Sequence, residues 1–98
     1  MNISTEEVSL FFKSLADQSR LNILICLLDG EKCVSEIMDE VQMSQSAVSY
    51  QLKNLRQMHI VKSRREGKNI FYACGDSHVH EIIKVAVEHI NHLYNELH

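Results

Sequence analysis

The stretch SQSAVSYQLKNLRQMHIVKSRREGKNIFYAC, residues 44–74, changes its hydrophobic periodicity halfway along. Ser44 is a good N-cap, and apolar residues follow it at helical spacing: Ala47, Val48, Leu52 and Leu55. After His59, apolar and polar residues alternate loosely on both sides of the run EGK at 66–68, a pattern typical of a β-hairpin. The stretch therefore predicts a helix followed by a hairpin.

A second, shorter helix is predicted just before it, over residues 33–41, with its apolar residues on one face. Only Gln42 and Met43 separate the two helices. The outer face of the helix that follows Ser44 carries amide and hydroxyl groups that can reach the edges of bases: Gln45, Ser46, Ser49, Tyr50 and Gln51. This arrangement predicts a helix-turn-helix over residues 33–57, and the hairpin over 60–74 predicts a wing.

The rest of the chain is predicted to be helical. Residues 5–15 form one expected helix, Asp17 caps a mostly apolar second one that ends at Asp29-Gly30, and Asp76 opens a long terminal helix over 76–97. The 98 residues are 45% apolar and contain no proline and no low-complexity run. They predict a single winged helix-turn-helix domain over residues 1–98, mainly α with a β-hairpin wing.

The charge distribution favours a phosphate-binding segment although the net charge is −3. Residues 51–75 carry six Lys or Arg and one acid, whereas the segments on either side are net negative. The side chains expected to neutralise phosphates are Lys53, Arg56, Arg64, Arg65 and Lys68. A solvated basic face with no partner is the alternative explanation.

The cysteines and the hydropathy predict a cytoplasmic protein. Cys26, Cys33 and Cys74 are odd in number and widely spaced, which argues against a disulfide framework and fits a reducing compartment. We find no apolar run long enough to span a membrane and no secretory leader. We therefore expect no membrane partner.

Five of the six histidines lie at or after His78, on the predicted terminal helix. His78 and His89 are eleven residues apart, so they project from the same side of the helix but are separated along it by about 16 Å. Zinc–nitrogen bonds are only about 2 Å long, so one helix cannot bring Asp76, His78, His89 and His92 around one ion.

Two copies of the helix, packed antiparallel about a twofold axis near Lys84 and Val85, would solve this problem. Asp76 and His78 of one chain would meet His89 and His92 of the other at two equivalent sites. One carboxylate and three imidazoles suit tetrahedral Zn(II), with Co(II) as a substitute. We expect a homodimer formed through the N- and C-terminal helices, and the terminal helix offers these apolar residues to the interface: Ile82, Ile83, Ala86, Val87, Ile90 and Leu93.

The chain resembles the ArsR/SmtB family of dimeric winged-helix repressors that respond to metal ions. The resemblance covers nearly the whole chain through LADQSRLNIL (15–24), EKCVSEI (31–37), MSQSAVSYQLKNLRQMHIV (43–61), REGKNIFYAC (65–74) and the terminal helix. One subgroup carries the pattern Asp-x-His, ten residues, His-x-x-His, and here Asp76, His78, His89 and His92 match it. The resemblance implies a zinc sensor that leaves its operator, an inverted repeat, when metal binds and so derepresses efflux or storage genes.

Several residues have a second interpretation. We expect His80 and His98 to face solvent, and His59 to pack before the wing, where its main-chain carbonyl would accept a hydrogen bond from the other nitrogen of a ligating imidazole. Cys26 is expected in the core. Arsenic- and cadmium-sensing relatives carry Cys-Val-Cys where this chain has Cys33-Val34-Ser35, so Cys33 is predicted to be a small apolar helix residue. Cys74 is a weak candidate for a soft-metal site.

Three functions remain open at this level. The first is the zinc-responsive repressor, and the second is a winged-helix regulator whose metal is structural or whose inducer is Ni(II), Cd(II) or As(III). The third is a metalloenzyme, which we disfavour because four protein ligands leave no open position for a substrate. The sequence thus predicts a protein that is not an enzyme.

Overall fold

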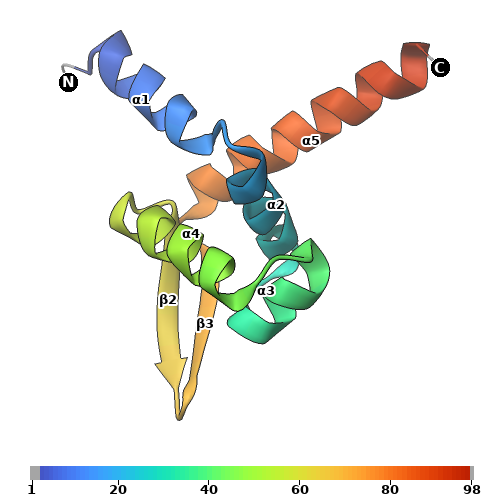
Figure 1. Ribbon diagram of the computed structural model, residues 1–98. Helices are drawn as coiled ribbons and strands as arrows, with labels where there is room; N and C mark the ends of the chain where they lie inside the picture. The colour runs from blue at the N-terminus through green and yellow to red at the C-terminus, as the bar shows by residue number, and fades with distance from the viewer. Residues whose placement is uncertain (1–2, 98) are drawn as a thin grey trace.

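The computed structural model describes residues 3–97, which contain five α-helices and three β-strands (Figure 1). The elements are α1 (Thr5–Leu15), α2 (Gln18–Cys26) with a 3₁₀ turn (Leu27–Asp29), β1 (Lys32–Cys33), α3 (Val34–Val41), α4 (Gln45–Gln57), β2 (Val61–Glu66), β3 (Asn69–Cys74) and α5 (Ser77–Leu97). The predicted fold class, mainly α with a hairpin wing, is confirmed.

Hydrogen-bonded caps mark the starts of three helices, at Asp17 and Ser44 as the sequence predicts and at Ser4 for α1. The Ser4 hydroxyl accepts the Glu7 N–H at 3.3 Å. Asp17 accepts the Ser19 N–H at 3.2 Å, and Ser44 accepts the Ala47 N–H at 3.1 Å. Each bond satisfies a backbone donor that the first turn of a helix leaves free, and this fixes where the helix starts.

The wing belongs to a three-stranded antiparallel sheet in the order β1-β3-β2. β2 and β3 turn at Gly67, whose φ of 63° lies in the left-handed region that glycine adopts easily. β1 pairs with β3 through Lys32↔Tyr72 and Cys33↔Phe71. This third strand is missing from the sequence prediction because two residues show no periodicity.

Cys33 corrects a second expectation. It ends β1 and is the N-cap of α3, so it lies outside the helix in which we expected it. Its backbone N–H donates to the Glu36 carboxylate at 3.0 Å, and its Sγ lies 3.2 Å from the Ser35 hydroxyl. Cys33 therefore acts at a helix start, and its side chain is half-buried.

The core lies between α2, α3, α4, the sheet and the first two turns of α5. Its most deeply buried side chains are Ile23, Leu24, Leu27, Ile37, Val48, Leu52, Leu55, Ile60 and Val61. The apolar segment after Asp17 contributes the buried Ile23, Leu24 and Leu27 to this core, but Ile25 is 43% exposed. Its α-helix ends at Cys26 and continues only as a 3₁₀ turn to Asp29. Gly30, at φ 138°, ends that turn.

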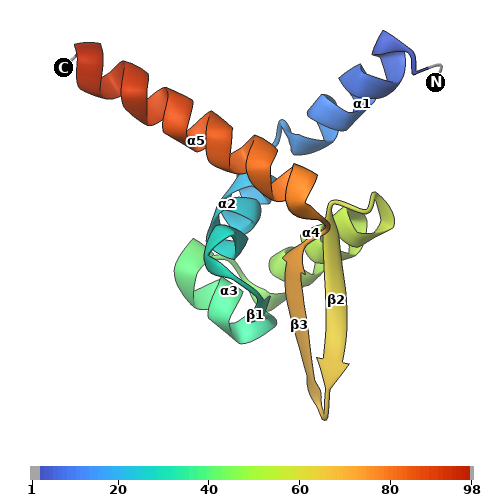
Figure 2. The same ribbon diagram turned by 180° about the vertical axis from the view of Figure 1, so that it is seen from behind.

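α1 and α5 leave the body on the same side and diverge, while the wing points the opposite way (Figures 1 and 2). The molecule is flat, with extents of 43 × 41 × 21 Å. Leu15 is the buried residue of α1, and Val79 and Ile83 are those of α5. Much of both helices is therefore open to solvent.

Gly75 ties the end of α4 to the start of α5. Its N–H donates to the Ile60 carbonyl at 2.8 Å. A Cβ at this position would lie 2.3 Å from the carbonyl oxygen of His59, which is backbone and cannot swing away. A glycine is required here by close approach, so the His59 carbonyl stays beside the residue that precedes Asp76.

Replacing Gly75 by alanine should therefore destabilise the fold. We expect Gly75→Ala to lower the free energy of unfolding by about 2–3 kcal/mol, the cost of overpacking a dense site. Gly67→Ala is the matched control: its Cβ would meet open space, so only the left-handed backbone penalty of about 1–2 kcal/mol remains. Urea unfolding of both variants measures this, and equal losses would show that the close approach at Gly75 is not tight.

Candidate nucleic-acid interface and metal-binding helix

The outer face of α4 presents the polar groups that the sequence assigns to base contacts, with one exception. Gln45, Ser46, Ser49 and Tyr50 are exposed, and Tyr50 keeps 63% of its surface. Lys53 and Arg56 follow on the same helix and line a hollow between α4 and the wing, together with Ser49 and Tyr72. A helix face rich in amides and hydroxyls beside a basic hollow can place base-reading groups and phosphate-binding groups side by side.

Gln51 is the exception, because it does not face outward. Its side chain is half-buried, its Oε1 accepts from Arg20 Nε at 2.9 Å, and its Nε2 donates to Ser19 Oγ at 3.1 Å and Asp17 Oδ2 at 3.3 Å. The expectation of an outward Gln51 fails because it borders the buried face, three residues after Val48 and four before Leu55.

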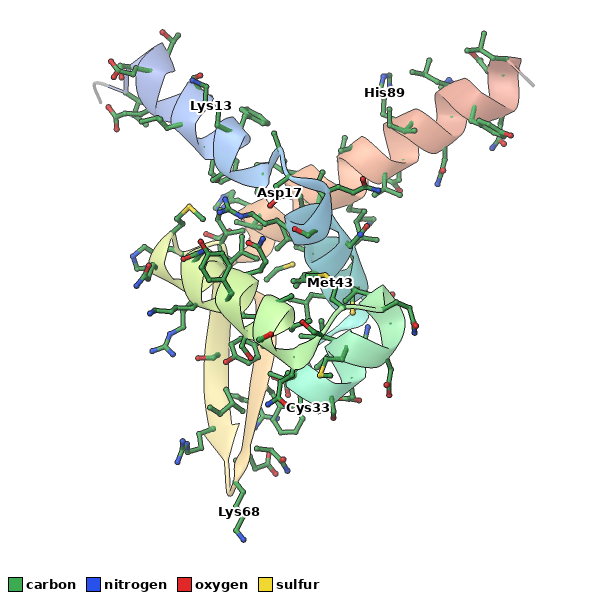
Figure 3. The ribbon with its side chains drawn as sticks, viewed as in Figure 1. Lys13, Asp17, Cys33, Met43, Lys68 and His89 are labelled. Atoms are coloured by element: carbon green, nitrogen blue, oxygen red, sulfur yellow. The ribbon has the colours of Figure 1, made fainter. Side chains whose placement is uncertain are left out.

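The wing also divides its basic residues into two kinds. Arg64 forms ion pairs with Glu31 and Glu66, and its guanidinium lies 4.9 Å above the centre of the Phe71 ring. The hydrogen bonds from Arg64 lower the pKa of Glu31, so the pair stays ionised. Arg65 and Lys68 are exposed, and Figure 3 shows Lys68 pointing outward from the tip. The charge of Arg64 is thus compensated by two carboxylates of the same chain.

The four predicted metal donors all lie at exposed positions on or just before α5. Asp76 Oδ1 accepts the Val79 N–H at 3.0 Å, so this carboxylate caps the helix, and it lies 3.6 Å from His78 Nδ1. The backbone hydrogen bond, helped by His78, lowers the pKa of Asp76. His92 Nε2 lies 3.4 Å from Glu96 Oε1. His89 projects from α5 on the side that faces the space between α1 and α5 (Figure 3).

A single chain does not assemble these donors. Within residues 3–97, no three His, Cys, Asp or Glu side chains come together in a way that could hold a metal ion. Asp76 and His78 form one pair near the start of α5, and His89 and His92 form another on its later turns. This separation is what the helical spacing predicts for two half-sites.

The remaining histidines and cysteines sort by burial. His80 corrects our expectation of a solvent-facing side chain: it is half-buried, with Nε2 3.0 Å from the Leu28 carbonyl. His59 is exposed rather than packed. Burial raises the pKa of the Cys26 thiol to about 11 and also raises that of Cys74, so neither thiol readily gives the thiolate that a soft metal needs. His98 lies outside the described residues.

Exposed apolar side chains line two grooves beside α5. One groove, between α1 and α5, is lined by Phe12, Ile82, Val85, Ala86 and His89, and a second, between α2 and α5, by Leu21, Ile25, Val87 and Ile90. Ile83 corrects the expected interface set, because it is 3% exposed and already belongs to the core. Ile83 follows the exposed Ile82 in the sequence, but its side chain lies on the side of α5 that packs against the core.

The fold and these surfaces define the class of the protein: it is a winged helix-turn-helix DNA-binding regulator. Residues 17–63 match the arsR family of bacterial regulatory proteins. The chain belongs to the ArsR family.

Three relatives illustrate the likeness. The chain is 38% identical to a transcriptional repressor SmtB homolog of Synechocystis over 87% of its own length and 64% of that protein. It is 38% identical to the regulator NmtR of Mycobacterium tuberculosis, over 90% of the chain and 73% of that protein. The solution structure of a homodimeric winged helix-turn-helix DNA-binding domain from Mycobacterium bovis superposes with a TM-score of 0.77 at 27% identity, covering 99% and 94% of the two chains.

These relatives are transcription regulators and not enzymes, which confirms the corresponding prediction. None of the helices within residues 3–97 has the length and hydropathy needed to cross a lipid bilayer.

Proposed function

We propose that this protein is a metal-responsive transcriptional repressor that acts as a homodimer in the cytoplasm. The observation that carries the proposal is the placement of two donor pairs, Asp76 with His78 at the start of α5 and His89 with His92 on its later turns. Between the pairs, α5 exposes the apolar side chains of Ile82, Val85 and Ala86. One chain cannot join the pairs, and an antiparallel second copy would. The apolar grooves beside α1 and α5 would then be covered by the same contact.

The DNA-binding residues follow from the exposed face of α4 and the wing. Gln45, Ser46, Ser49 and Tyr50 are proposed to reach base edges, and Lys53, Arg56, Arg65 and Lys68 to contact phosphates. Arg64, which is ion-paired with Glu31 and Glu66, would bind phosphate only by exchanging these carboxylates. Two recognition helices related by a twofold axis would read an operator that is an inverted repeat.

The proposed inducer is Zn(II), with Co(II) as a substitute. One carboxylate and three imidazoles from two chains give the oxygen and nitrogen donors that zinc accepts, without added water. A ligating imidazole normally donates its other N–H to a carboxylate or a carbonyl. The main-chain carbonyl of His59 lies beside Gly75, the residue before Asp76, and is one such acceptor. We therefore propose that carbonyl as support for a ligand.

Metal and DNA would be coupled through the geometry of the dimer. If metal favours an arrangement in which the two recognition helices are badly spaced, DNA must weaken metal binding by the same factor. A relative named as a transcriptional repressor, the SmtB homolog, supports repression as the outcome of DNA binding. We propose that the metal-free form is the one that represses. Derepressed genes for metal efflux or storage complete the proposal.

Cobalt absorption spectroscopy tests the site. Tetrahedral d–d bands at one Co(II) per chain, without a thiolate charge-transfer band, are expected from one carboxylate and three imidazoles. A thiolate charge-transfer band would show that a cysteine binds the metal. An octahedral spectrum would indicate that the inducer is nickel-like.

Asp76→Asn should separate metal binding from folding. Asparagine caps helices as well as aspartate does, so its oxygen can keep the bond to the Val79 N–H. We expect the melting temperature of the metal-free protein to stay close to that of the wild type. The zinc affinity should be at least about tenfold lower, because even the loss of a residue that only hydrogen-bonds to a metal ligand lowers the affinity by that factor. Calorimetric zinc titration measures it, with Asp76→Ala as the variant that loses both; unchanged zinc affinity in Asp76→Asn would remove Asp76 from the site.

A structural metal is the second candidate function, favoured by the exposure of α5, which a bridging ion would brace against its copy. In that case a chelator should lower the melting temperature and the DNA affinity together. In a sensor, the chelator should raise the DNA affinity.

A further inference from the structure

Gln51 lies among the residues of α4 that face DNA in our proposal, yet its amide is directed toward the body of the protein. Both N–H groups of its Nε2 have an acceptor, Ser19 Oγ at 3.1 Å and Asp17 Oδ2 at 3.3 Å. Its Oε1 accepts from Arg20 Nε at 2.9 Å. An amide with both donors engaged cannot also make a two-bond contact with a base.

The partners of Gln51 are three residues around the first turn of α2. Asp17 is the N-cap of that helix, and Ser19 donates to it from both its backbone N–H and its hydroxyl. Arg20 Nη1 donates to the carbonyl of Ser14, near the end of α1, at 3.1 Å. The cluster therefore joins the end of α1, the start of α2 and the middle of α4.

The cluster lies where α1 and α2 meet, and Figure 3 shows Asp17 at this junction above α4. The Arg20 side chain is 23% exposed and that of Asp17 43%, so water reaches the cluster only in part. Its bonds are directional. Of the three bonds that Gln51 makes, two have a charged partner, Arg20 or Asp17, which makes them stronger than ordinary neutral ones. They add an orientation that the apolar contacts of Val48, Leu52 and Leu55 do not specify by themselves.

We propose that Gln51 is a positioning residue for DNA recognition: through Arg20, Ser19 and Asp17 it fixes the orientation of the recognition helix on the α1–α2 junction, and it does not read bases. The inference rests on the proposed function, since it assigns Gln51 a role in operator binding. Because α1 is also proposed to pack in the dimer interface, this cluster is a polar link between the interface side and the DNA-reading side of each chain.

Introducing a negative charge in place of the neutral amide tests the role with a rescue. Gln51→Glu places a carboxylate against that of Asp17. We expect the affinity for a duplex selected by the wild-type protein from random-sequence DNA to fall at least about tenfold, the cost of losing a half-buried hydrogen bond to a charged group. Asp17→Asn in the same chain restores an N–H donor opposite the new carboxylate, keeps a good N-cap, and should recover most of the affinity. A base-reading glutamine would not be rescued in this way.

The control for charge is Asp39→Asn combined with Gln51→Glu. Asp39 is exposed on α3, so this pair has the same net charge as the rescued variant but leaves the cluster unrepaired. It should bind DNA as weakly as Gln51→Glu alone. Equal recovery with Asp39→Asn and with Asp17→Asn would overturn the proposal, because charge alone would then explain the loss.

A double-mutant cycle keeps the proposal testable if Gln51→Glu fails to fold. Gln51→Met and Arg20→Met keep the side-chain volume and remove the bonds, and melting temperatures monitor the fold. We expect the double variant to lose no more DNA affinity than the more affected single variant, because both act through one cluster. Ser49→Ala, at a proposed base contact, should instead add its loss to that of Arg20→Met.

Two results would contradict the positioning role. One is additive loss in the Gln51→Met and Arg20→Met cycle, and the other is a Gln51→Met variant that loses discrimination at a single base pair of the selected duplex, as a base contact does. Failure of the proposed function looks different, since the wild-type protein would then select no duplex from random DNA.

Discussion

His89→Ala should abolish the response to zinc. His89 lies eleven residues from His78 on the same face of α5, and its imidazole projects beside the exposed apolar stripe where a second chain would pack. Its removal leaves three donors for an ion that favours four. Losing a residue that only hydrogen-bonds to a ligand lowers metal affinity by up to about a hundredfold, so we expect the loss of a ligand itself to lower the zinc affinity by more than that. Zinc titration with a competing chelator measures this.

His80→Ala is the matched control on the same helix. The His80 imidazole bonds to the carbonyl of Leu28 and is not one of the proposed donors. We expect a lower melting temperature and an unchanged zinc affinity, the opposite pattern to His89→Ala. A His89→Ala dimer that still released DNA at the wild-type zinc concentration would refute the proposed site.

Val85→Glu should convert the dimer into a monomer. Val85 is 49% exposed, lines the groove between α1 and α5, and lies at the proposed twofold axis, where each copy would meet itself. Two carboxylates facing each other in an apolar contact would have to be desolvated together. With one half-site per molecule, operator affinity should fall by about 10²–10⁴-fold, the usual gain from joining two binding modules.

Val85→Thr is the control, since it has the same shape and no charge. Analytical ultracentrifugation should show the threonine variant as a dimer and the glutamate variant as a monomer with a melting temperature reduced by the loss of its partner. If the glutamate variant remained a dimer with full zinc affinity, the interface would have to lie elsewhere than on α5.

The helices were predictable because their signals are local. Ser4, Asp17 and Ser44 are caps, and each cap is followed by apolar residues at helical spacing, so the starts of α1, α2 and α4 agree with the sequence within a residue. The hairpin was predictable for the same reason, since alternation and Gly67 act over a few residues. β1 was missed because its two residues are defined only by pairing with β3, far along the chain.

The partners of three side chains were not predicted because they lie far away in sequence. Gln51 bonds to residues more than 30 positions earlier, Arg64 to Glu31, and His80 to the carbonyl of Leu28. The sequence shows that Gln51 is polar and on a helix, but whether it faces DNA or the body depends on where α2 packs. Ile83 was assigned to the interface because periodicity alone cannot separate the core-facing stripe of α5 from the partner-facing one.

The metal donors show the converse. Their spacing on one helix forbids a site within a single chain, and this conclusion needs only the rise per residue. The structure adds that Asp76 is also a helix cap and that its carboxylate already engages the Val79 N–H. The sequence places Asp76 at the start of the helix and among the metal donors but does not show that its carboxylate bonds to this N–H, which is why Asp76→Asn is an informative variant.

The central claim is that metal binding and DNA binding exclude each other in one dimer. The direct measurement is the fluorescence anisotropy of a labelled operator duplex, titrated with the metal-free protein and with protein holding one zinc per chain. We predict that zinc weakens the operator affinity by at least about tenfold, within the range of coupling seen between sites in one protein. Equal affinity in the two titrations, or tighter binding with zinc, would contradict the account.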